Sequence, residues 1–96
     1  EGEIITATLG DKRAILLSHH GQLSTGASIE EACVIAQLIE RAAKLQLLAM
    51  AAGTIKPILP QLGREAHDWI SRPKRHGAAF NYYARQNLRQ HADCLN

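Results

Sequence analysis

The stretch from Ser28 to Gly53 constrains the fold more than any other part of the chain. Ser28 followed by Glu31 is a capping box, Glu30 adds negative charge to the first turn, and Gly53 with Pro57 beyond it predicts the helix end. Two apolar faces follow from 3.6 residues per turn: Ala32, Ile35, Ala36, Ile39, Ala42 and Ala43 on one, and Val34, Leu38, Leu45 and Leu48 on the other. Such a helix requires packing partners on two sides, which is more surface than the other segments obviously supply.

The segment before this helix predicts a short β-hairpin. Residues 1–10 fit either a short helix or, over Ile4–Thr8, a strand. Ala14–Ser18 is typical of a short buried strand, Gly21 permits a turn, and Gln22–Thr25 can return as a second strand.

The segment after the helix predicts two further helices. Thr54–Pro60 is an extended linker, because each proline biases the residue before it away from helix. A short helix over 61–71, a basic hinge over 72–77 and a final helix over 78–92 follow. The expected organisation is therefore an N-terminal strand–turn–helix segment, a linker and a C-terminal helical segment: 1–53, 54–60 and 61–96.

Composition narrows the class of protein. Ninety-six residues, 46% hydrophobic and 21% charged, suit one soluble domain or a piece of one. The formal net charge of +2 is too small to imply a polyanionic partner, and no apolar run is long enough to cross a membrane. Two distant cysteines indicate no disulfide framework, which favours the cytoplasm. The start at Glu1, without methionine, leads us to expect a fragment of a longer protein.

The adjacent pair His19-His20, directly before Gly21, is the first candidate for chemistry. Neighbouring residues on a strand point to opposite faces, so at most one of the two can bind a given metal ion. The other histidines are scattered, and the sequence contains no HxH, HExxH or CxxC spacing. Taken alone, these residues favour a structural histidine over a metal ligand.

The order of features over residues 11–53 (DKRAILLSHHGQLSTGASIEEACVIAQLIERAAKLQLLAMAAG) resembles the C-terminal part of the class II aldolase/adducin family. A buried strand, a histidine-glycine, a glycine-containing turn, a Ser-x-Glu-Glu-Ala helix start and a long Ala- and Leu-rich helix occur in that order. The family includes zinc-dependent fuculose- and rhamnulose-phosphate aldolases, ribulose-phosphate 4-epimerase and the non-enzymatic adducin head. The resemblance implies an α/β fold, a three-layer α/β/α sandwich, to which this chain contributes one hairpin and most of a helical layer.

The resemblance also implies a metal site. His20 matches a zinc-binding histidine of the family, while His19 and Gly21 are expected to support it or the turn. In the intact parent, the zinc would act as a Lewis acid in cleaving a C–C bond of a small hydroxylated carbonyl substrate, with or without a phosphate group. The family's HxH pair, catalytic glutamate and phosphate loop are missing from this chain. We therefore expect no catalytic residue here, weak zinc binding and no activity alone.

The same resemblance implies partners. The missing N-terminal part of the fold, or further subunits as in the family's tetramers, would cover the long helix, and the intact protein would bind a small-molecule substrate. Two other interpretations remain open. One is an adducin-like interaction module without metal, and the other, less favoured, is a small basic nucleic-acid binder.

The nucleic-acid interpretation depends on residues 69–92, which are basic, lack acidic residues and contain Trp69, Phe80, Tyr82 and Tyr83. The aromatic side chains are expected on the packing face of the final helices, which favours a structural role for them. Three basic residues remain candidates for binding an anion: Arg72, Lys74 and Arg75.

Overall fold

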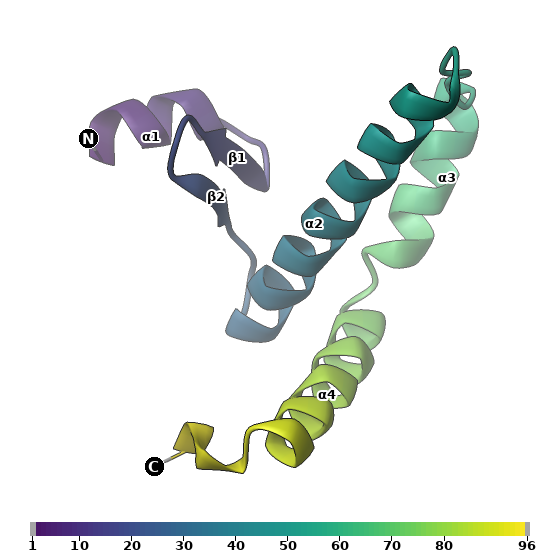
Figure 1. The fold of residues 1–96 in the computed structure, drawn as a ribbon. Helices are drawn as coiled ribbons and strands as arrows, with labels where there is room; N and C mark the ends of the chain where they lie inside the picture. The colour runs from purple at the N-terminus through teal and green to yellow at the C-terminus, as the bar shows by residue number, and fades with distance from the viewer. Residues whose placement is uncertain (1, 96) are drawn as a thin grey trace. The chain divides into compact units, whose positions relative to one another are not determined.

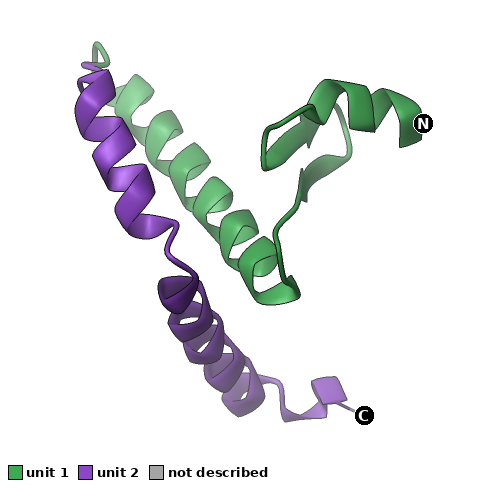
Figure 2. Ribbon diagram, turned by 180° about the vertical axis from the view of Figure 1, so that it is seen from behind, with its two compact units in different colours: residues 1–55 green, residues 56–96 purple. Residues whose placement is uncertain are grey.

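The computed structural model describes residues 2–95 and divides the chain into two compact units, residues 1–55 and 56–96 (Figure 2). The first unit contains helix α1 (Gly2–Leu9), strands β1 (Ala14–Leu17) and β2 (Gly21–Ser24), and helix α2 (Ile29–Ala52). The second contains α3 (Pro60–Ile70), α4 (Pro73–Gln90) and the 3-10 helix η1 (Ala92–Leu95) (Figure 1). The described chain is thus mostly helical with one two-stranded hairpin, as a partial α/β fold would be.

The N-terminal segment forms a helix, which decides between the two structures expected for residues 1–10. The Gly10 N–H donates to the Thr6 carbonyl at 3.1 Å, and Gly10 adopts a positive φ of 54°. A residue without a Cβ takes this left-handed conformation at little cost, so α1 ends where glycine allows the chain to turn toward β1.

The hairpin pairs β1 and β2 in antiparallel register from Ala14↔Ser24 to Leu17↔Gly21. Both the N–H and the hydroxyl of Thr25 donate to the Arg13 carbonyl, at 2.8 and 3.0 Å, and extend the pairing by one position. The expectation of a buried strand is wrong for β1, because Leu16 is 73% exposed. A sheet with two strands in the described residues packs on one face only and leaves the other open.

Helix α2 begins beside β2 and is held there by polar contacts. The Ser28 hydroxyl accepts from the Glu31 N–H at 3.1 Å and caps the helix. The Ser24 hydroxyl donates to the Ala32 carbonyl at 3.0 Å, and the Gln22 amide donates to the next turn of α2 at the same distance. The apolar core of this unit lies at the same end of the helix, with Val34 5% and Ile35 8% exposed.

The hydroxyl of Ser24 should contribute measurably to this attachment. We expect Ser24→Ala to lower the free energy of unfolding by about 1 kcal/mol, because a partly buried hydrogen bond to α2 is lost. Ser18→Ala makes the same chemical change at an exposed turn position and should cost less than about 0.5 kcal/mol. Urea unfolding followed by circular dichroism measures both. Equal effects of the two substitutions would contradict a role for the contact with α2.

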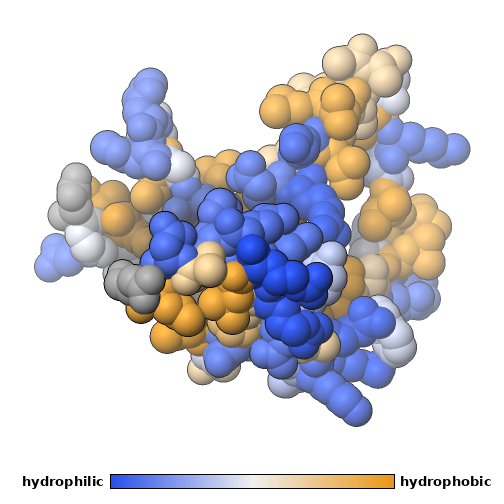
Figure 3. All heavy atoms as spheres, turned by 60° about the horizontal axis from the view of Figure 1, so that its bottom comes forward, coloured by the Kyte–Doolittle hydropathy of each residue, from blue (hydrophilic) through white to orange (hydrophobic). Residues whose placement is uncertain are grey.

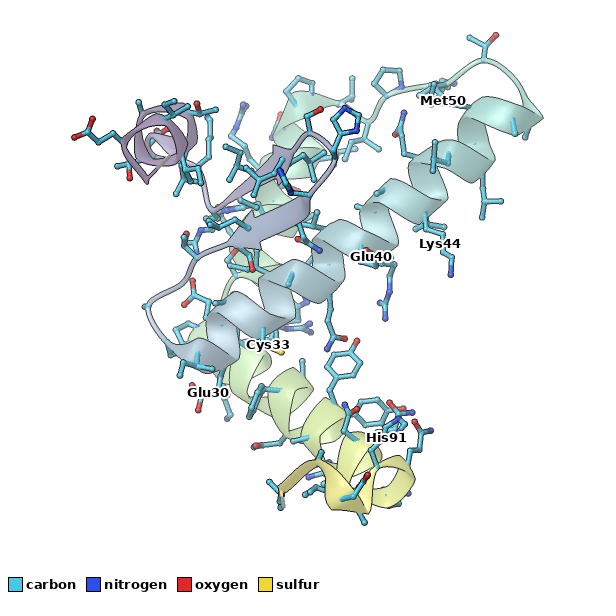
Figure 4. All side chains as sticks on the ribbon, turned by 60° about the vertical axis from the view of Figure 1, so that its left-hand side comes forward. Glu30, Cys33, Glu40, Lys44, Met50 and His91 are labelled. Atoms are coloured by element: carbon cyan, nitrogen blue, oxygen red, sulfur yellow. The ribbon has the colours of Figure 1, made fainter. Side chains whose placement is uncertain are left out.

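The second half of α2 is not covered by the other elements of its unit. Every residue from Glu40 to Ala52 is exposed, including large apolar side chains: Leu45, Leu47, Leu48 and Met50. Figure 4 places Glu40, Lys44 and Met50 along this half, and Figure 3 shows apolar side chains, in orange, open at the surface of the chain. The two-faced apolar pattern of the sequence therefore forms a long helix of which only the first half is packed within its unit.

The second unit corrects the expected position of the break between its helices. Residues 72–77 are not a hinge, because α4 begins at Pro73 and the break is confined to Ser71 and Arg72. Proline suits the first position of a helix, where its fixed φ is already helical and no N–H is required. Pro60 occupies the equivalent position in α3, so it belongs to that helix and not to the linker. Among residues 2–95, no helix combines the length and apolar character of a membrane span.

Candidate functional site

His19 and His20 lie in the loop of the hairpin, and the first strand ends one residue earlier than the sequence predicted. Strand β1 ends at Leu17, and the His20 N–H donates to the Leu17 carbonyl at 3.1 Å. The two orientations are therefore set by a tight turn and not by strand alternation. Both side chains are exposed, and no group in the described part of the chain hydrogen-bonds to either imidazole ring.

The backbone of this turn explains the residues around His20. His19 has a φ of 64°, a conformation that glycine and asparagine adopt most readily and in which histidine is tolerated. Gly21, the first residue of β2, has a φ of 122°, which side-chain-bearing residues rarely adopt. No atom lies within 4 Å of the position that a Cβ would take there, so backbone conformation and not crowding requires glycine. His20 is thus held between two residues with unusual backbone angles.

The described residues do not by themselves fit a bound metal ion. Within residues 2–95 no three side chains of histidine, cysteine, aspartate or glutamate converge on one point. A zinc site needs three or four protein ligands, and His20 would supply one. No reaction step can be assigned to a metal ion held by these residues alone.

Ser28 caps the helix as expected, and Glu31, the other expected capping residue, also connects the helix to the strand. The Glu31 carboxylate is 13% exposed and accepts from the Arg13 guanidinium, which joins the start of α2 to the residue before β1. A cavity of about 300 Å³ lies between them, lined by Asp11, Lys12, Arg13, Thr25, Gly26, Ala27 and Glu31. Its charges are of both signs and are already paired in part, so it offers no excess charge to a ligand.

The basic residues near the start of α4 form a second candidate site. Arg72, Lys74 and Arg75 lie with Trp69 and Ala78 around an open pocket of about 470 Å³. The guanidinium carbons of Arg72 and Arg75 each lie 4.4 Å from the centroid of the Trp69 ring. We call this arrangement the basic pocket. All five residues belong to the second unit.

Sequence reasoning missed Trp69 as part of this pocket. We expected the aromatic residues on the packing face, but Trp69 is 50% exposed. Phe80 and Tyr83 are half-buried, and Tyr82 is exposed with its ring 5.5 Å from that of Tyr83. The sequence signal for the pocket was the spacing from Trp69 to Arg72 and Arg75. This spacing could be interpreted only once the break between α3 and α4 was placed correctly.

Comparison with known protein families finds a match for the N-terminal part of the chain. Residues 1–47 match the model of the Class II Aldolase and Adducin N-terminal domain. The match includes the hairpin with His19, His20 and Gly21 and most of α2, and it extends through α1, for which we had drawn no family resemblance. No curated protein matches the chain. Residues 1–47, just under half of the chain, are therefore similar to the class II aldolase and adducin family.

Proposed function

We propose that this chain is part of a class II aldolase-like lyase subunit and that His20 is one of its metal ligands. The single observation that carries the proposal is the exposed imidazole of His20, presented by a hairpin turn inside the family-matched segment. In the complete protein, the substrate would be a small hydroxylated carbonyl compound, with or without a phosphate group, cleaved at a C–C bond with a zinc or other divalent ion.

The hairpin supports this role because it fixes the backbone position of His20. The backbone pairing of β1 with β2 and the contacts from β2 to α2 fix both strands on either side of the turn. A ligand on such a supported element holds its metal with less reorganisation than one on a free loop. The remaining ligands and the catalytic glutamate would come from polypeptide outside this sequence. That polypeptide would also supply the rest of a three-layer α/β/α fold.

Partners follow from the open half of α2. Its exposed leucines and methionine would be covered by the missing part of the fold or by subunits of a homo-oligomer, as in the family's tetramers. Both cysteines are free, which agrees with a cytoplasmic location for the proposed enzyme.

The test is to express two proteins in parallel. One is the product of the complete reading frame that contains this sequence, and the other is the 96-residue chain. We expect the complete protein to purify with about one zinc per subunit, to release aldehyde and ketone products from hydroxylated sugar phosphates, and to lose this activity with a chelator. The short chain should show neither property. A complete protein without metal and without lyase activity would instead support an adducin-like interaction module.

A further inference from the structure

We propose that the basic pocket of the second unit binds the phosphate group of a small organic phosphate monoester. The pocket lies wholly within residues 56–96, outside the family-matched segment, so this inference does not depend on the proposed lyase function. Three cationic side chains, one tryptophan ring and the small side chain of Ala78 line a space of about 470 Å³. Sites for small ligands commonly have volumes of this order.

The charge of the pocket is not neutralised by the protein. Within the described residues, none of Arg72, Lys74 and Arg75 forms an ion pair with a carboxylate. The nearest acidic residue in sequence, Asp68, contacts the His67 ring at 3.3 Å. The pocket therefore presents an uncompensated charge of about +3, which suits a phosphate dianion better than a singly charged carboxylate.

The two arginines are positioned for this task by Trp69. A guanidinium stacked over an aromatic ring uses its flat face, and its N–H groups still point outward in the guanidinium plane. Those edges match the spacing of two phosphate oxygens and can donate a pair of parallel hydrogen bonds. Stacking also restricts two long side chains before a ligand arrives, which reduces the entropy lost on binding.

The position of the cations at the start of α4 also favours an anionic ligand. Lys74 and Arg75 lie in the first turn of α4 and Arg72 is its N-cap, while no acidic residue is present in that turn. The N-terminal end of a helix carries partial positive charge, so each cation there is unfavourable by a few tenths of a kcal/mol to about 1 kcal/mol. A bound anion would relieve this repulsion, whereas a purely structural role would favour acidic residues.

A compact phosphate fits these residues better than a nucleic acid does. The other arginines of α4, Arg85 and Arg89, follow Arg75 by ten residues or more, which is about 15 Å or more along a helix. A nucleic-acid backbone needs a continuous basic track and free aromatic rings for base stacking. The Trp69 ring is already engaged by two guanidinium groups, so the pocket lacks an unoccupied platform.

The test uses Trp69, the single tryptophan of the chain, as a fluorescent reporter inside the pocket. The 96-residue chain is titrated with glycerol 3-phosphate at constant ionic strength, with glycerol and potassium chloride as controls. We expect a saturable fluorescence change with a Kd of about 1 mM for the phosphate and none for the controls. Arg72→Gln or Arg75→Gln should raise the Kd by about tenfold or more, since each removes a charge-assisted hydrogen bond.

Arg85→Gln is the matched control, because it removes the same charge from the same helix outside the pocket. Its Kd should stay within about twofold of the unchanged chain. Arg72→Lys keeps the charge but loses the paired hydrogen bonds, so it should weaken binding without affecting helix content by circular dichroism.

Three results would overturn the proposal. One is a response to glycerol 3-phosphate no larger than that to potassium chloride. Another is an equal loss of affinity in Arg85→Gln and Arg72→Gln, which would mean that net charge and not the pocket attracts the anion. Tight, salt-dependent binding of a single-stranded oligonucleotide, weakened equally by Arg85→Gln, would also overturn it and favour a nucleic-acid surface.

Discussion

Replacing Gly26 with alanine should destabilise the first unit by about 1–3 kcal/mol. A Cβ on Gly26 would lie 2.7 Å from the backbone nitrogen of Ala32 and 2.9 Å from the Glu31 Cβ. The closest of these atoms is backbone, so a side-chain rotation cannot relieve the clash. Gly26 is thus the point where the loop from β2 passes directly against the first turn of α2.

That first turn cannot move without losing other contacts. The Ala32 N–H donates to the Ser28 carbonyl at 3.0 Å, the Ser28 hydroxyl caps the helix, and the Glu31 carboxylate pairs with Arg13. Displacing α2 to accept a methyl group would strain all of these at once. The expected destabilisation therefore combines overpacking with a weakened helix start.

The measurement is urea unfolding by circular dichroism together with amide hydrogen exchange by NMR. In Gly26→Ala, amides of β1, β2 and the first turns of α2 should exchange faster. Gly77→Ala is the matched control: it lies inside α4, a Cβ there meets no atom within 4 Å, and it should stabilise by about 0.5–1 kcal/mol. A Gly26→Ala chain within about 0.5 kcal/mol of the original would contradict the close approach.

Elements fixed by local chemistry could be predicted from the sequence. The start and end of α2 follow from Ser28 and Gly53, because capping depends on residues within one turn. The hairpin followed from its apolar pattern and from Gly21. The exposure of β1 could not be predicted from the sequence. Leu16 is apolar, like a core residue, but it lies on a face that no described element covers. Burial depends on what packs against a strand, and a single sequence segment does not contain that information.

The start of α4 shows a different kind of error. Proline both ends helices and begins them, and the hinge predicted over residues 72–77 includes Pro73, which is the first residue of α4. The sequence analysis grouped Trp69 with the basic residues of 69–92, but the predicted hinge gave no reason to expect them around one pocket. The assignment of His20 as a metal ligand comes from the family resemblance and stays a prediction, whereas the turn that carries His20 was not predicted. The left-handed φ of His19 depends on how β1 and β2 pair.

His20→Ala should abolish bound zinc in the complete protein, while His19→Asn should leave it in place. On the proposed function, the first substitution removes one of the three or four ligands that a zinc ion requires, and the loss of one such ligand would leave the site too weak to survive purification. The second substitution introduces asparagine, a residue type that adopts the left-handed conformation of position 19 without strain. Asparagine there preserves the turn that orients His20.

Plasma emission spectrometry of the purified variants gives zinc per subunit, and thermal unfolding shows whether each variant remains folded. His19→Val provides a further control, because a β-branched residue is strongly disfavoured at a φ of 64°. It should lower both stability and zinc content, whereas His20→Ala should lower zinc content with little loss of apo-protein stability, since the His20 side chain is exposed. Equal zinc loss in His19→Asn and His20→Ala would mean that both rings bind the metal. Full zinc retention in His20→Ala would show that His20 is not a metal ligand.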